Sequence, residues 1–284
     1  MAQIAATEAN AAIVERWRTV ALKALFAKMV AKNRITNVTE DIQEMGDILH
    51  VKINPKPTVG DITAASGAFT AEAVTITNVD LTINKWKYVA HDVVDIADIQ
   101  SDIDLYNNFS QAFVPALGEQ IETDIFALHS SATTNTAIGD AVAGDAFGDG
   151  VILPAQLTLD DLDIPEEDRS WLLPPVAINQ LLKDSKFVDA HRTGMPKGAM
   201  TTGIMADIYG TPAYKSTKVA TSGGVRKALY LHRNGLMVGI QRNIKIEKFA
   251  RTQFSTPFAA SVLYGTAILR NNHVQVCNVK STLV

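Results

Sequence analysis

Near the start of the chain, apolar residues recur at the spacing of a helix. Between residues 13 and 32 they fall mostly three or four positions apart, and Arg and Lys side chains occupy positions between them. This pattern predicts an amphipathic helix that carries Trp17 and Phe26 among its apolar residues. Such a face has to be covered, either by the chain's own core or by a neighbouring molecule.

Two later stretches alternate with the two-residue period of a β-strand. The first spans residues 47–54, and the second, residues 74–88, changes phase twice, which predicts one long strand with a bulge or a sharp twist. Residues 55–73 between them combine Pro and Gly with Ala, Ser and Thr, a composition that cannot build its own packed core. We therefore expect a hairpin whose tip projects from the body.

The longest helical pattern runs over residues 97–129, with apolar side chains three, four or seven positions apart and Asp98 or Ser101 available as a cap. About 30 residues at ~1.5 Å each make a rod of roughly 45 Å. Pro115 falls inside this rod. We expect a kink near Gln111, because the proline ring removes one backbone hydrogen bond.

The remainder of the chain mixes helix and strand patterns, which predicts an α+β protein. Residues 132–150 are rich in Gly, Ala, Thr and Asp and are interpreted as a mobile surface loop. A turn at 164–169 leads into a strand at 170–173 and a helix from Pro174 or Pro175 to residue 183. After a Gly-, Met- and Thr-rich stretch at 194–203, with tight turns at 222–224 and 234–235, strands are expected at 212–219, 228–232, 236–241, 244–249, 261–269 and 273–279.

Composition narrows the classes of function. The 284 residues are 47% hydrophobic, enough for one large domain or two smaller ones. Against 26 Lys and Arg stand 30 Asp and Glu, a formal net charge of -4 without a basic tail, which argues against a dedicated nucleic-acid reader. The single cysteine, Cys277, excludes an internal disulfide and a thiolate zinc site and fits a reducing cytosol.

The apolar runs and the first residues argue against a membrane or exported protein. Residues 1–10 are Ala-rich and lack the basic and apolar regions of a secretory signal, so no export is expected. Charged or polar residues interrupt each apolar run well before the ~20 residues needed to cross a bilayer. We therefore expect no membrane partner.

Local signatures of enzymes are missing. The sequence has no G-x-x-x-x-G-K-[ST] phosphate loop, no G-x-S-x-G nucleophile elbow, no H-E-x-x-H zinc helix and no dinucleotide G-x-G-x-x-G between a strand and a helix. The six histidines are scattered without metal-ligand spacing, and the acidic residues at 160–168 are interpreted as a solvated turn rather than a cation site. No catalytic residue, metal or cofactor is predicted, although an α/β enzyme with a nonlocal active site stays open.

The order of these elements resembles the major capsid proteins of tailed double-stranded-DNA phages, with the Hong Kong 97-type capsid fold that bacterial encapsulin shells share. An arm, an extended hairpin, a long spine helix, a compact α/β domain and returning strands follow one another as in that family. Local stretches also resemble the family, and each is weak alone. These stretches lie at residues 99–104, 164–169, 174–184, 209–212 and 264–270.

The resemblance implies a specific layout and two departures from it. A further helix common between spine and axial domain is shortened here, and the arm helix starts soon after the first residue, which implies a mature form or a separate scaffold protein. The implied parts are an N-terminal arm at 1–45, an extended hairpin (the E-loop) at 46–88, a peripheral domain with the spine helix at 89–158 and 240–284, and an axial α/β domain at 159–239.

The implied function is structural. The chain would assemble with copies of itself, as hexamers and pentamers, into an icosahedral head shell around phage DNA, as a virion component built in the host cytoplasm. Implied partners are a scaffold protein, a portal, in some relatives a decoration protein, and packaged DNA held by weak non-specific contact. Contacts between subunits are expected at Trp17, Phe26, Lys56, Pro57 and Phe69.

Some relatives join a hairpin lysine covalently to an asparagine of the adjacent subunit, and Lys56 is the candidate donor here. Three alternatives to a phage shell stay open. They are an encapsulin-type nanocompartment shell, the α/β enzyme described above, and a phage tail or decoration protein, against which the long spine helix argues.

Overall fold

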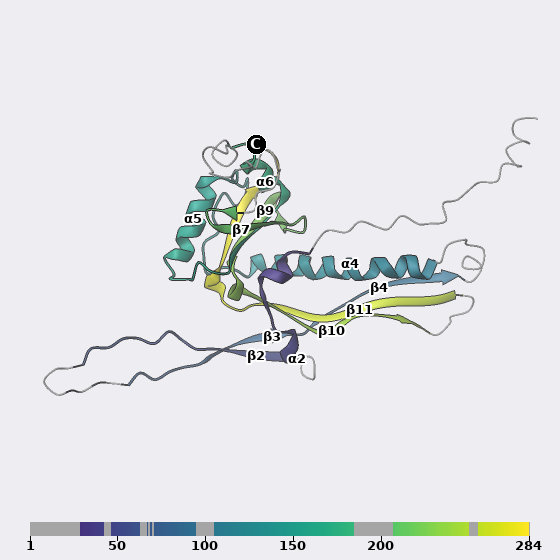
Figure 1. Cartoon of the computed structure of the whole chain (residues 1–284), viewed down its shortest axis with the longest axis horizontal. Helices are drawn as coiled ribbons and strands as arrows, with labels where there is room; N and C mark the ends of the chain where they lie inside the picture. Colours follow the sequence, from purple (N-terminus) through teal and green to yellow (C-terminus); the bar gives the residue numbers. More distant parts are fainter. Residues whose placement is uncertain are drawn as a thin grey trace, which may run out of the picture.

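The computed structural model describes residues 29–42, 47–62, 67, 69, 71–94, 105–184, 207–249 and 255–283. The predicted arm helix with Trp17 and Phe26, the stretch at 194–203 and the first part of the predicted spine helix lie outside these residues. Within them, Figure 1 shows three parts: a long hairpin, an elongated sheet lined by one helix, and a compact α/β unit.

The elongated sheet carries helix α4 along one face (Figure 1). β10 pairs antiparallel with β11, and β11 pairs antiparallel with β4, in the strand order β1-β10-β11-β4. Four apolar residues of α4 recur every four positions and are at most 3% exposed, so the predicted stripe faces the core: Phe113, Leu117, Ile121 and Ile125. Figure 1 shows α4, which contains Pro115, without a sharp bend, so the expected kink is wrong. The bounds are β1 Thr36–Asn37, β4 Lys85–Val94, α4 Leu105–Ala127, β10 Leu236–Lys248 and β11 Ser255–Ile268.

The compact unit is a six-stranded sheet buried on both faces. On one face Trp171 and Tyr230 stack with ring centroids 4.3 Å apart in the core that contains α5 and α6. On the other face Leu172, Leu229 and Leu231 join the core of α4 and the elongated sheet, so the two parts share one continuous interior. The bounds are α5 Asp149–Asp160, β5 Arg169–Leu173, α6 Pro175–Leu181, β6 Asp207–Ile208, β7 Thr211–Lys215, β8 Thr221–Ser222, β9 Val225–His232 and β12 Val274–Lys280.

Most predicted turns and short elements are confirmed. β5 and α6 match the expected strand and the helix that starts at a proline. Gly223 and Gly224 have φ of 60° and 79°, a backbone region that favours glycine, and they form the expected turn before β9. The remaining short elements are η1 Ala31–Arg34, α2 Thr39–Ile42, η2 Leu128–Ser130, η3 Arg233–Gly235 and η4 Asn271–His273.

The second alternating stretch is two strands, and the prediction of one long bulged strand is wrong. β3 (Thr77–Thr82) pairs with β2 (Ile48–Ile53), whereas β4 pairs with β11. Ile83, between β3 and β4, is buried. The changes of phase mark the point at which the chain leaves one sheet for another whose buried face points differently.

Between β2 and β3 the chain runs out and back as an extended arm. Figure 1 shows this arm projecting well beyond both sheets. The described residues at 54–62 and 71–76 form no strand, and all of them are exposed. The predicted projecting tip is therefore confirmed.

The Gly-rich segment after α4 is a loop at the surface up to residue 148, as predicted, and hydrogen bonds attach it to β12. The amide of Ile138 donates to the carbonyl of Val276 at 3.0 Å, and the amide of Asp145 donates to the carbonyl of Asn278 at 3.0 Å, so β12 holds the segment. The segment then continues into α5, twelve residues long. The acidic turn at 160–168 therefore follows this helix and does not replace it, as had been expected.

The C-terminal strands are confirmed, with two changes. The patterns at 236–241 and 244–249 form one strand, β10, whose register against β11 shifts between Ile240 and Lys245. β12 leaves the elongated sheet and pairs antiparallel with β9 over seven residue pairs. The last strand of the chain therefore completes the α/β unit.

Candidate intersubunit surfaces

The hairpin exposes apolar side chains that the described chain does not cover. Val59 is 95% exposed, Phe69 77% and Ile62 65%, and Val74 and Ile76 on the returning arm are more than half exposed. Groups of large apolar side chains at such exposure mark interaction surfaces. The projecting arm has no core of its own, so the described part of the chain leaves these side chains uncovered.

Polar contacts tie the two arms of the hairpin to each other. The amide and the hydroxyl of Thr58 donate to Glu72 at 2.9 and 3.2 Å. Across β2 and β3, His50 Nδ1 lies 2.5 Å from Asp80 Oδ1. These groups are exposed, so each contact adds little stability. Local contacts of this kind can hold the two arms side by side without a core beneath them.

The predicted contact residues of the hairpin all lie at the surface. Lys56, Pro57 and Phe69 are exposed. Lys56 Nζ lies 3.4 Å from Asp163 Oδ2 of the same chain, in a pair whose side chains are both more than 80% exposed. A contact of Lys56 with another copy, and its role as a cross-link donor, stay predictions.

A second apolar surface lies on the elongated sheet, on the face opposite α4. Val89 and His91 of β4 pack on the α4 side, with the His91 ring 5.1 Å from that of Phe113. Alternation along the strand therefore turns Trp86 and Tyr88 away from α4, where they are 70% and 73% exposed. Sequence analysis placed both aromatics in the hairpin, and only the pairing of β4 with β11 assigns them to this sheet.

Two rows of paired residues extend this outer face across β11 to β10. Trp86 is paired with Leu263, and Tyr88 with Ser261, which in turn is paired with Lys245. At the far side Arg242 and Lys245 contact Glu247 at 3.2 and 2.7 Å. The Lys245 ammonium, with Arg242, lowers the pKa of Glu247. The face is thus aromatic at the β4 edge and charged at the β10 edge.

A buried carboxylate of α4 joins this helix to the compact unit and to the start of the described chain. Glu122 of α4 is 1% exposed, and it accepts hydrogen bonds from the Ser216 hydroxyl at 2.6 Å and the Val30 amide at 2.9 Å. Beside it, Met29 lies so close to Gly118 that a side chain there would collide with the thioether. These contacts hold residues 29 and 30 against α4.

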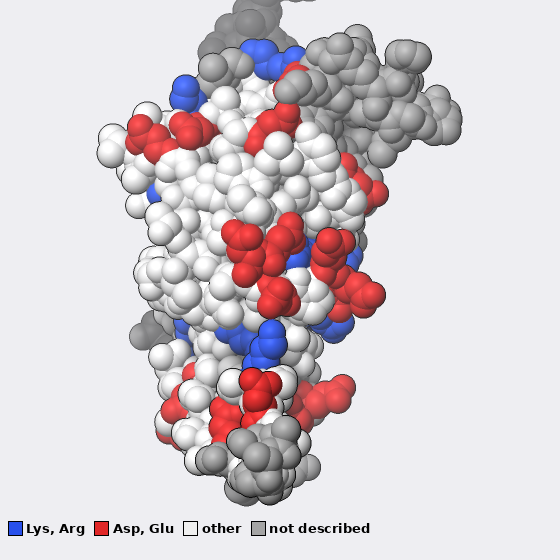
Figure 2. All heavy atoms as spheres, turned by 90° about the vertical axis from the view of Figure 1, so that its left-hand side faces the viewer, with Lys and Arg blue, Asp and Glu red and all other residues white. Residues whose placement is uncertain are grey.

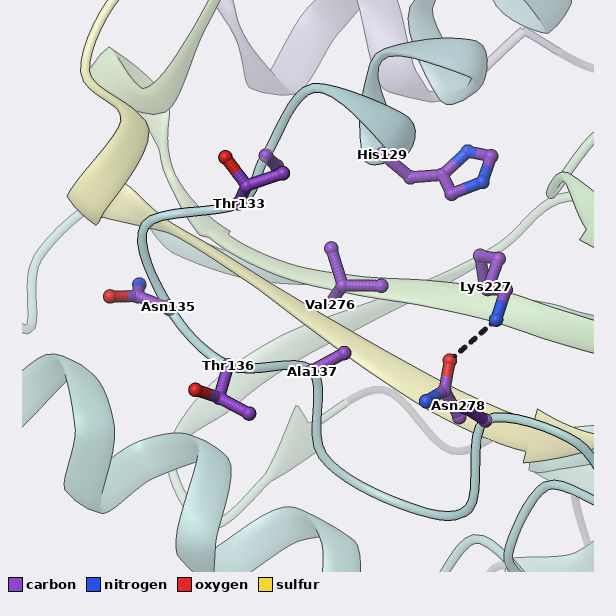
Figure 3. A pocket seen from close by; sticks show the side chains of 10 residues that line it. His129, Thr133, Asn135, Thr136, Ala137, Lys227, Val276 and Asn278 are labelled. Atoms are coloured by element: carbon purple, nitrogen blue, oxygen red, sulfur yellow. Dashed lines mark hydrogen bonds between the residues drawn. The ribbon is translucent and has the colours of Figure 1, made fainter.

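Figure 3 shows a cavity of about 430 Å³ between the segment after α4 and strands β9 and β12. Lys227 Nζ donates to Asn278 Oδ1 at 2.7 Å, and His129 Nδ1 lies 2.9 Å from the carbonyl of Phe126. The lining contains neither a carboxylate nor a thiol. The recorded hydrogen bonds of the two basic side chains go to a carbonyl and an amide oxygen and not to a hydroxyl, so the cavity gives no support to the enzyme alternative.

The acidic turn at 160–168 is mostly exposed. Arg169 donates to Asp160 at 2.6 Å and to the carbonyls of Ile164 and Pro165, which ties the turn to β5. Across the described residues, no three His, Cys, Asp or Glu side chains are grouped so that they could hold a metal ion. None of the described helices combines the length and the apolar character that a membrane span requires.

Comparison with known proteins gives a clear result at the level of structure alone. No family model and no curated protein matches the sequence. A structure from Mycobacterium phage Che8 has a TM-score of 0.78 at 24% identity, with 93% of this chain and 96% of that chain covered. The capsid of Cyanophage P-SCSP1u has a TM-score of 0.75 at 13% identity, with 95% and 93% covered.

The mature capsid of bacteriophage PhiM1 is similar as well, with a TM-score of 0.73 at 12% identity over 95% of this chain and 93% of that chain. Likeness over nearly the full length of several capsid subunits shows that this chain has their α+β fold. The resemblance to phage capsid proteins is thus confirmed for the fold.

Proposed function

We propose that the chain is a major capsid protein, which assembles with copies of itself into the icosahedral head shell of a phage and encloses double-stranded DNA. The observation that carries this proposal is the projecting hairpin, whose apolar side chains are 52–95% exposed, on a body that has the fold of capsid subunits. A chain that left these side chains in water would gain nothing from them. Copies of the same chain are the partners that a shell supplies.

The sheets support a Hong Kong 97-type layout. The arm is assigned to 1–45, the extended hairpin to 46–88, the peripheral domain to 89–158 and 240–284, and the axial domain to 159–239. Sheet membership favours three refinements of these bounds: β4 from residue 85 belongs with the peripheral sheet, while α5 and β12 belong with the axial unit.

The shell function follows from where the exposed surfaces lie. A hairpin that reaches beyond its own body meets a surface on the next copy that differs from itself, and repeated head-to-tail contacts close into rings. Hexamers and pentamers require the same contact at slightly different angles, and a hairpin tied only by local polar contacts can adapt to both. The neighbour's surface offsets the entropy lost when the arm is ordered.

The remaining expectations are part of the proposal. A scaffold protein, a portal and, as in some relatives, a decoration protein are partners of such a shell, and its place is the virion. The formal net charge of -4 supports weak, non-specific contact with packaged DNA, because an acidic wall does not attract phosphate. A structural role leaves the chain without catalytic chemistry.

Particle formation tests the proposal. We expect the purified chain, alone or coexpressed with the scaffold protein, to elute in the void volume of a size-exclusion column and to appear as closed hollow particles in electron microscopy. A stable monomer under every assembly condition, with and without the scaffold, would overturn the proposal. Filaments or sheets would show association without the curvature that a shell requires.

A further inference from the structure

Helix α5 carries apolar residues on two opposite faces. Its inward residues are at most 1% exposed and pack under the six-stranded sheet. On its outward face Leu153 is 48% and Leu157 57% exposed, four residues apart, and Leu162 just beyond the helix end is 41% exposed. The inward residues are Val151, Ile152, Ala155 and Leu159. The fold of the described chain explains the inward face and leaves the leucines of the outward face uncovered.

An acidic border lies next to these leucines. Six of the nine residues at 160–168 are Asp or Glu, and all six are exposed. Figure 2 views the molecule from the side on which α5 lies and shows a group of acidic side chains beside a broad uncharged area. Asp160 is offset by Arg169 and Asp163 by Lys56, and no other ion pair is resolved for the turn within the described residues. The outward face therefore suits an apolar partner that carries positive charge.

The chain itself contains a segment with these properties. Residues 13–28 hold four Lys and Arg residues against one Glu, with apolar residues at helical spacing between them. At ~1.5 Å per residue, a helix of this length measures about 24 Å, against about 18 Å for α5. Length, charge and apolar pattern all match the outward face of α5.

The positions of the two surfaces favour a second copy as the source of this segment. Residues 29–35 are held against α4, and Ala31 and Ile35 belong to the core on one face of the six-stranded sheet. α5 covers the opposite face of that sheet, and Figure 1 shows the two on opposite sides of the compact unit. An arm that leaves one side and a receptor on the other side produce a head-to-tail contact, which closes into a ring of copies.

We propose that the outward face of α5, formed by Leu153, Leu157 and Leu162 with the acidic turn at 160–168, binds the basic N-terminal segment 13–28 of a second copy of the chain. This inference rests on the proposed function, since it requires assembly, and it names one contact within that assembly. The leucines bury the apolar side of the segment, and the turn faces its Arg and Lys side chains. Salt should weaken the contact between the acidic turn and the Arg and Lys side chains, and it should leave the apolar contact of the leucines unchanged.

Disulfide trapping between copies tests the contact directly. The native Cys277 is fully buried, and burial raises the pKa of its thiol, so introduced cysteines are the reactive ones. One preparation carries Leu157→Cys, and a second, larger by a C-terminal tag, carries Leu22→Cys, Leu25→Cys or Phe26→Cys, one at a time. The two are coassembled, oxidised with oxidised glutathione and separated on a non-reducing gel. Phe249→Cys, which replaces a side chain 54% exposed, stands in for Leu157→Cys as the matched control.

We expect a mixed dimer of tagged and untagged chains with Leu157→Cys for at least one arm position, and none with Phe249→Cys. Particles that form without any such dimer would overturn this inference and leave the proposed function standing. A chain that carries both cysteines and links only within itself, at high dilution, would overturn it in favour of self-docking. A chain that forms no particles under any condition overturns the proposed function and this inference together.

A second measurement removes the dependence on disulfide geometry. Leu153→Ser with Leu157→Ser should raise the protein concentration needed for half-maximal assembly by at least about tenfold, because two leucines lose their burial at the contact. The melting temperature of the unassembled chain should fall by only a few degrees, since both side chains are about half exposed there and Ser is only a slightly poorer helix former than Leu. Phe249→Ser is the matched control. An unchanged assembly threshold in the double variant would count against the contact.

Discussion

The hairpin and the layer formed by α4 and its sheet contain the same kinds of apolar residue, but the layer buries them and the hairpin exposes them. Phe113, Leu117, Ile121 and Ile125 of α4 are at most 3% exposed, whereas Phe69, Val59 and other apolar residues of the hairpin are 52–95% exposed. The layer gains its stability inside one copy. The apolar side chains of the hairpin stay exposed in the described part of one copy, so they add stability only when they are covered.

Polar contacts differ between the two regions in the same way, since they are buried in the layer and exposed in the hairpin. In the layer, Glu122 is buried with two donors, and the Tyr264 hydroxyl donates to Asp124 at 2.7 Å, where burial and then that carboxylate raise the pKa of Tyr264. In the hairpin, the contacts of Thr58 with Glu72 are exposed. Changes in the layer should therefore alter folding, and changes in the hairpin should alter assembly.

Removal of the hairpin tip should give the largest difference between an effect on assembly and an effect on folding. Replacement of residues 55–73 by a short Gly-Ser turn should abolish particles in electron microscopy, because the side chains that reach a neighbour are lost. The free energy of unfolding should change by no more than about 1 kcal/mol, since the described part of this segment is exposed. Insoluble protein would instead place the segment in the core, and retained particles would remove the hairpin from assembly.

A matched pair of phenylalanines gives the next largest contrast. Phe113→Ala should lower the free energy of unfolding by about 3–5 kcal/mol, because it empties a site where the ring stacks 5.3 Å from that of Phe258. Phe69→Ala, which removes the same atoms from a side chain 77% exposed, should cost no more than about 0.5 kcal/mol. Denaturant titration measures both. Equal losses would erase the difference between the two regions.

The buried carboxylate that joins α4 to Val30 and Ser216 should have a smaller effect. Glu122→Ala leaves two donors without an acceptor and should lower the free energy of unfolding by about 2–3 kcal/mol. Glu122→Gln keeps the shape and one acceptor, so its loss should be clearly smaller. Thermal and urea unfolding of both variants measure this. A loss that is equal in the two would assign the effect to the carboxylate charge and its second acceptor oxygen, and would leave no part for packing.

The smallest expected effect is a loss of folding stability at acidic pH. Burial, with Arg270 and His232 nearby, lowers the pKa of His273 to about 4, and burial also lowers the pKa of His232. The unfolded chain binds these protons near pH 6.5 and the folded chain does not, so stability is present above pH 6.5 and falls as the pH drops toward 4. The loss should reach about 1–2 kcal/mol.

Urea unfolding between pH 7.5 and 4 measures this loss, and His273→Gln should reduce its slope. The chain without residues 55–73 should show the same slope as the intact chain, because both histidines lie in the body. A slope that disappears with the hairpin would place the titrating groups there instead.

Sequence analysis predicted the elements whose signal is local. The alternation at 47–54 and the four-residue spacing along α4 identified the element and the side that packs, and the proline that opens α6 identified the start of that helix. It missed α5 because Gly148, Gly150 and Pro154 obscure a helical stripe that is clear once the inward residues are known to be buried. It also counted Trp86 with the hairpin, since a change of phase does not state which strand lies alongside.

By itself, the sequence determined most of the segments that are helical or extended, that a weakly apolar tip projects from the body, and the order of elements that resembles a capsid subunit. Only the tertiary structure decided that β4 joins β11, that β12 completes the α/β sheet, and that the leucines of α5 and the aromatics of β4 are left uncovered. The physical reason is the distance along the chain over which each signal acts. Periodicity reports which side of an element is apolar, whereas the element that covers that side lies far along the chain or in another copy.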